Sequence, residues 1–218
     1  MTDPRLPALI FDCDGVLVDS EYLASRVESD VTRDLGLTLG LEEAHEMFLG
    51  KTVEGVLDAI AARTGTRPSS AWVYNWAFAT AHAFMRELKA VDGVGVAVEE
   101  LRRRGHRMAV ASQSPLARVR LSLQVAGLAG QFGDHIYVAS MVPRPKPAPD
   151  IYLLAAERLG AVPGECIVIE DSPAGATAAR AAGMRVIGYA PGRTAAAMQT
   201  SGARVIRSMH ELIAALEA

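Results

Sequence analysis

The chain has 218 residues, of which 50% are hydrophobic and 22% are charged, and its formal charge is −3. This size suits one large domain, or a core domain that carries a smaller insertion. The charge gives no electrostatic reason to expect nucleic acid or an anionic membrane as a partner. No apolar stretch is long enough to cross a bilayer, so we expect a cytoplasmic protein without a membrane contact, and we favour a monomer.

The first predicted element is a short buried strand over residues 9–11, which Asp12 and Asp14 follow directly. Burial of two acids at the end of a strand is costly unless a cation or hydrogen bonds compensate their charge. The pair therefore suggests a site for a hard metal ion with a reactive aspartate. Asp14 and Gly15 alone are also typical of a turn, so this signal needs support from the rest of the chain.

Residues 20–90 show only helical periodicity. Glycines that act as stops or loops separate the helical segments. We predict helices over residues 21–35, 41–48, 52–64 and 70–88. Trp72 and Trp76 lie four residues apart in the last of these segments, so they share one helix face and are expected to pack inward.

From residue 91 onward, short apolar runs alternate with helical segments. The runs predict strands over residues 108–111, 136–138, 167–169, 186–187 and 205–206, and the segments predict helices over residues 115–126, 148–159 and 174–182. This alternation indicates a parallel sheet with helices on both faces. We therefore predict an α/β fold with a Rossmann-like core domain, residues 1–19 and 91–218, and a helical cap domain, residues 20–90, inserted after the first strand.

The cysteines and histidines offer no competing chemistry. Cys13 and Cys166 have neither the spacing of a zinc site nor that of a disulfide framework, and we interpret both as small buried side chains in a reducing environment. The five histidines form no metal-binding pattern. Among them, His45 could face a cleft, but the sequence does not place it.

Polar side chains also follow two later strands. Ser112 and Gln113 come after the second predicted strand, at a helix start whose free amide groups suit an anion, although an ordinary helix cap explains Ser112 taken alone. Prolines on both sides of Lys146 restrict the backbone and fix where its ammonium group points. Glu170 and Asp171 follow the fourth predicted strand as a second acidic pair.

The carboxyl ends of parallel strands meet at one edge of a sheet, so these groups are expected to converge. Oxygen ligands without histidine or cysteine suit Mg²⁺. A cation, a lysine and helix-start amides together form an electrostatic pocket for phosphate. An aspartate can attack phosphorus and form an aspartyl-phosphate, while a second carboxylate donates a proton to the leaving group and later activates water.

Four motifs follow one another along the chain: Asp12-x-Asp14-Gly15-Val16, Ser112, Lys146 and Glu170-Asp171. In order and context they resemble the four motifs of the haloacid dehalogenase-like superfamily. The resemblance covers nearly the whole chain, and the helical insertion stands where that superfamily places its first-type cap. The segments around the two acidic pairs look most like the branch of phosphatases and β-phosphoglucomutases.

The resemblance implies a role for each acidic residue. Asp12 would be the nucleophile and a metal ligand. Asp14 would be the general acid/base and would give its backbone carbonyl to Mg²⁺. Asp171 would complete the metal site, and Glu170 would bind the metal directly or through water. The cap would close over the core, exclude bulk water and select the leaving group.

The resemblance also implies a phosphate site. Ser112 and Lys146 would hold the transferring phosphoryl group, with Gln113 beside them, and Lys146 would offset the negative charge around Asp12. Lys51 could take an anionic group of the substrate from the cap side, although an exposed charge near a helix start explains it equally well. The implied activity is Mg²⁺-dependent hydrolysis of a small phosphorylated metabolite, such as a sugar phosphate.

Two other activities of the superfamily, dehalogenase and sugar phosphate mutase, can be compared with phosphate ester hydrolysis. The dehalogenases work without the second acid of the first motif, and Asp14 is present here. The β-phosphoglucomutases typically carry a histidine in the hinge and an arginine in the cap, where counting from the motifs places Ala24 and Val53 in this chain. Both departures favour hydrolysis, and a sugar phosphate mutase remains the alternative.

A phospho-accepting receiver module is an alternative of another class. Receivers also place acids, a hydroxyl and a lysine at the carboxyl edge of a parallel sheet. Their phosphorylated aspartate lies on a later strand than the acidic pair, and they lack a large helical insertion after the first strand. A phosphate-binding module without catalysis would not need both Asp12 and Asp14.

Overall fold

The computed structural model describes residues 3, 5–48, 50–192 and 195–217, and within them a parallel sheet has the strand order β3-β2-β1-β4-β5-β6. The strands are β1 (Ala8–Phe11), β2 (Met108–Ser112), β3 (Ile136–Val138), β4 (Cys166–Glu170), β5 (Arg185–Tyr189) and β6 (Arg204–Ile206). Every neighbouring pair is parallel, with β1 between β2 and β4. The predicted parallel α/β core is confirmed.

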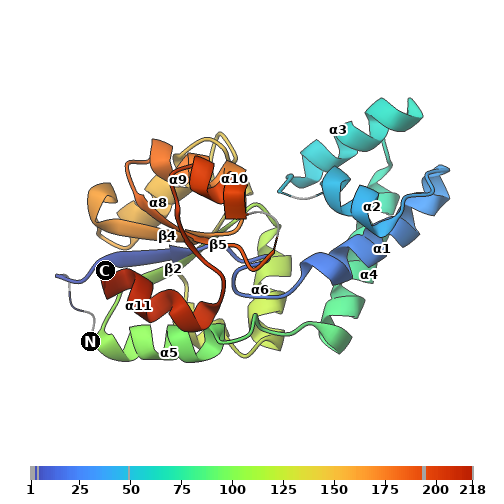
Figure 1. Cartoon of the computed structure of the whole chain (residues 1–218). Coiled ribbons are helices and arrows are strands. Elements are labelled where there is room, and N and C mark those ends of the chain that lie inside the picture. Colours follow the sequence, from blue (N-terminus) through green and yellow to red (C-terminus); the bar gives the residue numbers. More distant parts are fainter. Residues whose placement is uncertain (1–2, 4, 49, 193–194, 218) are drawn as a thin grey trace.

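Helices cover both faces of the sheet (Figure 1). One layer contains α8 (Asp150–Arg158), α9 (Pro173–Ala181) and α10 (Ala195–Thr200), and the other contains α5 (Val94–Arg104), α6 (Leu116–Val125), α7 (Ala129–Phe132) and α11 (Leu212–Glu217). In β1, Ala8 and Ile10 belong to the hydrophobic cluster on one face, whereas Leu9 and Phe11 belong to the cluster on the other. Because both faces are covered, the strand reads as a continuous apolar run.

Four helices lie between β1 and α5: α1 (Glu21–Thr32), α2 (Leu41–Phe48), α3 (Val53–Thr64) and α4 (Ser70–Glu87). They stand to one side of the sheet in Figure 1 and share a hydrophobic cluster of their own. Trp72 and Trp76 are buried in this cluster with ring centroids 5.7 Å apart, as predicted from their spacing. The indole N–H of Trp72 donates to the carbonyl of Val31 over 3.0 Å.

The two connections between these helices and the sheet pair with each other. The amide of Asp19 donates to the carbonyl of Lys89 over 3.0 Å, and the amide of Val91 donates to the carbonyl of Leu17 over 3.1 Å. This short pairing supports the predicted division into a core, residues 1–19 and 91–218, and a cap, residues 20–90. That division remains a proposal.

Several helix bounds differ from the predicted ranges. The first predicted helix is α-helical only to Thr32 and continues as a 3-10 turn, Arg33–Leu35. The helix predicted from residue 148 begins at Asp150, because a residue before proline is biased away from the α conformation and Pro149 follows Ala148. The predicted ranges did not include α5, α7, α10 and α11. Further 3-10 turns are Ala139–Met141, Pro163–Glu165 and Met209–Glu211.

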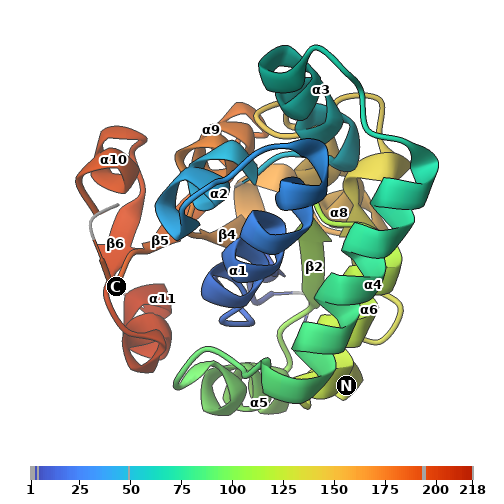
Figure 2. The same cartoon turned by 90° about the vertical axis from the view of Figure 1, so that its right-hand side faces the viewer.

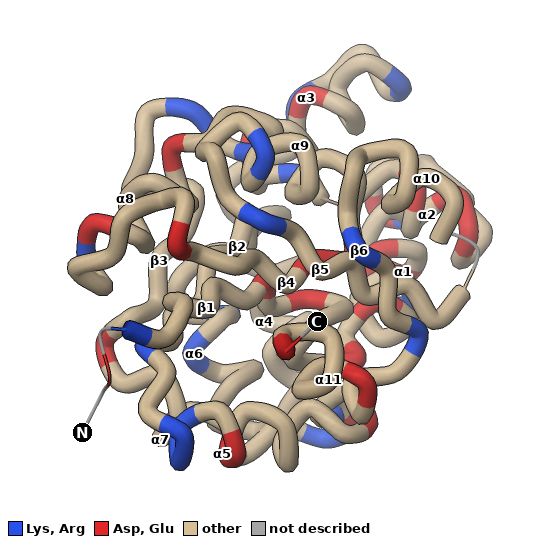
Figure 3. The backbone as a smooth tube through the Cα atoms, turned by 60° about the vertical axis from the view of Figure 1, so that its left-hand side comes forward, with Lys and Arg blue, Asp and Glu red and all other residues tan. Residues whose placement is uncertain are grey.

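Charged residues of both signs are interspersed along the backbone in the view of Figure 3, without a broad basic region. This distribution agrees with the small formal charge of −3. Within the ranges that the structure describes, no helix combines the length and the apolar character that a bilayer crossing requires.

Candidate active site

A cleft lies at the carboxyl ends of β1, β2 and β4, between the sheet and the inserted helices. Figure 2 views the molecule from the side of these helices and shows α1 in front of the sheet. The cleft wall combines Asp12, Ser112 and Glu170 from the strand ends with side chains of α1, α2 and α4. All the core residues that the sequence singled out are therefore brought to one place.

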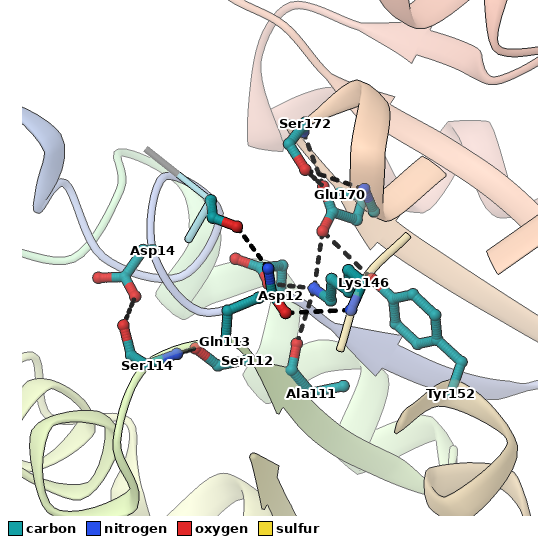
Figure 4. A network of polar contacts seen from close by, with 12 residues as sticks. Asp12, Asp14, Ala111, Ser112, Gln113, Ser114, Lys146, Tyr152, Glu170 and Ser172 are labelled. Atoms are coloured by element: carbon teal, nitrogen blue, oxygen red, sulfur yellow. Dashed lines mark hydrogen bonds and ion pairs between the residues drawn. The ribbon is translucent and has the colours of Figure 1, made fainter. Parts of the chain in front are cut away.

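Lys146 forms the centre of a buried ion-pair network (Figure 4). Its ammonium group lies 2.5 Å from Asp12 Oδ1 and 2.8 Å from Glu170 Oε1, and it donates to the carbonyl of Ala111 over 3.0 Å. Burial alone would lower the pKa of Lys146, but the two carboxylates outweigh burial and raise that pKa well above its usual range. Lys146 is therefore a fixed positive charge beside Asp12.

Glu170 is held through both of its carboxylate oxygens. Oε2 accepts from the backbone amide of Ser172 over 2.7 Å and from its hydroxyl over 2.8 Å, while Oε1 also accepts from the Tyr152 hydroxyl over 3.2 Å. The Ser172 hydroxyl accepts from the amide of Gly175 as well, which caps α9. A Cβ on Gly175 would lie 1.8 Å from Glu170 Oε1, so only glycine leaves room for this carboxylate.

Asp12, Glu170 and Asp171 form an acidic cluster in which one ligand oxygen of each lies within 4.8 Å of the others. Burial raises the pKa of Asp12 to about 7, with Lys146 opposing and Glu170 reinforcing this shift. Burial, together with the charges of Glu170 and Asp12, raises the pKa of Asp171 well above its usual range. Crowded carboxylate oxygens of this kind fit a hard divalent cation such as Mg²⁺, which would keep all three ionised.

Gly15 allows the acidic cluster to approach the first motif closely. Its φ of 78° lies in the left-handed region, and a Cβ there would lie 2.0 Å from Asp171 Oδ2. Two features therefore require glycine after Asp14: the left-handed backbone of the turn and the space that the Asp171 carboxylate occupies.

Asp14 lies apart from this cluster and points toward Ser114 (Figure 4). Its carboxylate accepts from the hydroxyls of Ser20 and Ser114, over 2.7 Å each, and from the Arg118 guanidinium over 3.1 Å. Burial would raise the pKa of Asp14, but Arg118 and the two hydroxyls outweigh burial and hold that pKa below its usual range. In this arrangement Asp14 is an ionised carboxylate.

Sequence reasoning missed these three partners of Asp14. Ser114 lies in the loop before α6, which begins at Leu116, and Arg118 lies in the first turn of that helix, so no helical spacing in the sequence relates the two residues. The Arg118 guanidinium also lies 5.0 Å from the centre of the Phe84 ring, on α4. Arg118 therefore joins the core helix α6 to the inserted helix α4.

Ser112 and Gln113 have chain partners in this structure. The Ser112 hydroxyl is buried and accepts from the amide of Ser114 over 3.0 Å. The Gln113 side chain accepts from the amide of Lys146 over 3.0 Å and donates to the carbonyl of Gly50. Gln113 thus links the loop before α8 to the loop between α2 and α3. The predicted phosphate contacts of both residues remain predictions.

The inserted helices supply the other wall of the cleft. Ser25, Glu28, His45 and Lys51 line it, and Ser25 Oγ lies 3.4 Å from His45 Nδ1. Lys51 is exposed at the edge of the cleft, where its ammonium group donates to the carbonyl of Glu46 over 3.2 Å. His45 thus faces the cleft, which the sequence could not decide.

A family model described as haloacid dehalogenase-like hydrolase matches residues 6–183. Hexitol phosphatase B from Escherichia coli (strain K12) is 36% identical over 190 residues, covering 86% of this chain and 85% of that protein. The chain spans only 20% of the length of another relative, Protein SUPPRESSOR OF QUENCHING 1, chloroplastic, from Arabidopsis thaliana, which is 32% identical over 208 residues and 93% of this chain.

Solved structures of haloacid dehalogenase-like proteins are also similar to this chain. A HAD family hydrolase from Deinococcus radiodurans R1, with bound phosphate and sodium, has a TM-score of 0.77 and 38% identity, covering 98% of this chain and 96% of that one. CbbY from Rhodobacter sphaeroides, in complex with phosphate, has a TM-score of 0.82 and 28% identity, covering 98% of this chain and 100% of that one. The resemblance drawn from the four motifs is confirmed, and the chain is an enzyme that belongs to the haloacid dehalogenase-like hydrolases.

Proposed function

We propose that the chain is a Mg²⁺-dependent phosphatase that hydrolyses a small phosphorylated metabolite, such as a sugar phosphate, through an aspartyl-phosphate intermediate. The observation that carries this proposal is the position of Asp12, which lies within an acidic cluster and receives a hydrogen bond from Lys146. A carboxylate placed between a cation site and a fixed ammonium group can receive an incoming phosphoryl group. The phosphatase relative and the phosphate-bound neighbours support this substrate class.

In the first step, Asp12 attacks phosphorus through one carboxylate oxygen, and the bond from phosphorus to the leaving alkoxide breaks. Lys146 orients Asp12 and offsets charge on the transferring group, with Ser112 holding a phosphoryl oxygen. Asp12, Glu170 and Asp171 would hold Mg²⁺, which would supply charge stabilisation for the phosphoryl oxygens. Lys51, at the edge of the cleft, is proposed to attract the anionic phosphate group of the substrate.

Asp14 is the proposed general acid and base. It gives a proton to the leaving alkoxide and then takes one from the water that hydrolyses the aspartyl-phosphate, so its proton balance closes over one turnover. The low pKa held by Arg118, Ser20 and Ser114 keeps Asp14 ionised, but it makes the carboxylate a weak base and leaves it without the proton that the acid must give. We therefore propose that Asp14 leaves these partners and turns toward Asp12 when a substrate fills the cleft.

A mutase is less well supported by the cleft. Ala24 and Val53 occupy the positions counted for the hinge histidine and the cap arginine of β-phosphoglucomutases, and both line the cleft. Neither side chain can hydrogen-bond a second phosphate group. Membership of the hydrolase family likewise favours an enzyme over a receiver or a phosphate-binding module.

The proposal is tested with p-nitrophenyl phosphate, which reports hydrolysis without a specific leaving group. We expect turnover with added Mg²⁺ and its loss in excess chelator, with recovery when Mg²⁺ is restored. Stoichiometric phosphorylation that persists without turnover would instead support the receiver alternative. In a parallel assay with a sugar phosphate as the substrate, formation of an isomeric sugar phosphate in place of free phosphate would support the mutase.

A further inference from the structure

Glu28 is a buried carboxylate in the wall of the cleft with no partner of its own. It lies on α1 with 5% of its surface exposed. No described residue forms a hydrogen bond or an ion pair with its carboxylate. The hydroxyl of Thr32 donates to the backbone carbonyl of Glu28 and not to its side chain. Ala24 and Ser25 precede it by one helical turn and also line the cleft, so the helix face that carries Glu28 is the face turned to the cleft.

Arg118 does not neutralise Glu28 by direct contact. The guanidinium of Arg118 attracts Glu28, but it hydrogen-bonds to Asp14, at 3.1 Å, and lies over the ring of Phe84. Burial raises the pKa of Glu28 to about 7, against the opposing effect of Arg118. A carboxylate that is buried without a hydrogen-bond donor lowers the stability of the fold. Its position is therefore explained better by a bound ligand than by packing.

We propose that Glu28 recognises the leaving group of the substrate by accepting hydrogen bonds from its hydroxyl groups, which makes the substrate a phosphate ester of an uncharged polyol or sugar. This inference rests on the proposed phosphatase function. An ionised carboxylate offers two acceptor oxygens and no donor, so it matches hydroxyl donors and repels a second carboxylate or phosphate. Ser25 and His45 stand on the same wall as further hydrogen-bonding groups.

The test compares kcat/KM for a hexitol 6-phosphate and for p-nitrophenyl phosphate, whose leaving group has no additional hydroxyls. Hydrogen bonds to a charged group correspond to a factor of about 10 to 100, so we expect Glu28→Gln to lower the value for the hexitol phosphate by about that factor. The value for the aryl phosphate should stay within about threefold of the wild type, because its leaving group does not need Glu28. Glu42→Gln, at an exposed position of α2, is the matched control and should change neither value.

The possible outcomes separate the two proposals. If the wild type hydrolyses both esters and Glu28→Gln changes them by the same factor, or changes neither, the role of Glu28 in recognition is overturned while the phosphatase function stands. An equal loss on both esters would indicate that Glu28 acts on Arg118 and Asp14 instead. If the wild type hydrolyses neither ester with Mg²⁺, the phosphatase function itself fails. Circular dichroism of the variant, which should match that of the wild type, excludes loss of the fold.

Discussion

Asp12 and Asp14 lie two residues apart, yet their neighbours hold them in opposite ways. Asp12 faces Lys146 and the acidic cluster, where burial raises its pKa. Asp14 faces two hydroxyls and Arg118, which lower its pKa. A nucleophile must be ionised and a general acid must hold a proton, so a cation beside Asp12 and release of Asp14 from Arg118 would have to reverse both shifts during catalysis.

The different roles proposed for Asp12 and Asp14 predict a specific defect for Asp14→Asn. The amide cannot take a proton from the attacking water, so hydrolysis of the phosphoenzyme should slow by about 10²- to 10⁴-fold. Rapid quenching during a single turnover would then show phosphorylated protein that accumulates and decays slowly. A variant that releases phosphate as fast as the wild type would rule out Asp14 as the base.

Glu28 predicts a pH-dependent effect on stability. Its pKa is raised from the ordinary value of 4.5 to about 7, so the folded state binds the proton more tightly than the unfolded state. The free energy of unfolding should therefore fall as pH rises through this range, by at most about 3 kcal/mol. Glu28→Gln removes this penalty, so the variant should be more stable than the wild type at about pH 8 and similar to it near pH 4.5.

Urea denaturation at the two pH values measures this difference, with Glu42→Gln as a control that should show none. A stability difference of the same size at both pH values would mean that titration of Glu28 is not its cause. Combined with the kinetic test above, a variant that is more stable but less selective would identify Glu28 as a residue kept for binding at a cost to the fold.

At the scale of elements, the start of α9 fixes the metal side of the cleft. Ser172 caps the helix and binds Glu170, and Gly175 leaves the space that Glu170 occupies. Similarly, Ser114 in the loop before α6 and Arg118 in the first turn of that helix position Asp14. The two acidic groups are thus oriented by two different helix starts.

This arrangement predicts that Gly175→Ala impairs Mg²⁺ binding. The added methyl group would displace the carboxylate of Glu170, which lies where a Cβ must go. We expect the Mg²⁺ concentration that gives half-maximal activity to rise by about tenfold or more, and the free energy of unfolding to fall by about 1–3 kcal/mol. Titration of activity with Mg²⁺ and urea denaturation measure the two effects.

Gly95→Ala is the matched control, because a Cβ at that position of α5 meets no atom within 4 Å. It should leave the Mg²⁺ dependence unchanged. If Gly175→Ala also left it unchanged, Glu170 would not be held in the way that its contacts indicate.

At the scale of the whole molecule, the sheet and its catalytic edge could be predicted from the sequence, because buried parallel strands are short continuous apolar runs and their carboxyl ends share one edge. The runs before Asp12, Ser112 and Glu170 therefore placed these residues together. The partners of Asp14 and the position of Glu28 could not be predicted in this way. Ser114 and Arg118 reach Asp14 through the packing of α6 against the sheet, and Glu28 reaches the cleft through the position of α1; local periodicity specifies neither.

In the proposed mechanism, Asp12 takes the phosphoryl group from a phosphomonoester. Release of phosphate from p-nitrophenyl phosphate in the presence of Mg²⁺, measured for the wild type and for Asp12→Asn, tests it most directly. We expect turnover by the wild type and a loss of about 10⁴-fold or more in the variant, with the fold retained by circular dichroism. Near-normal turnover by Asp12→Asn would contradict it.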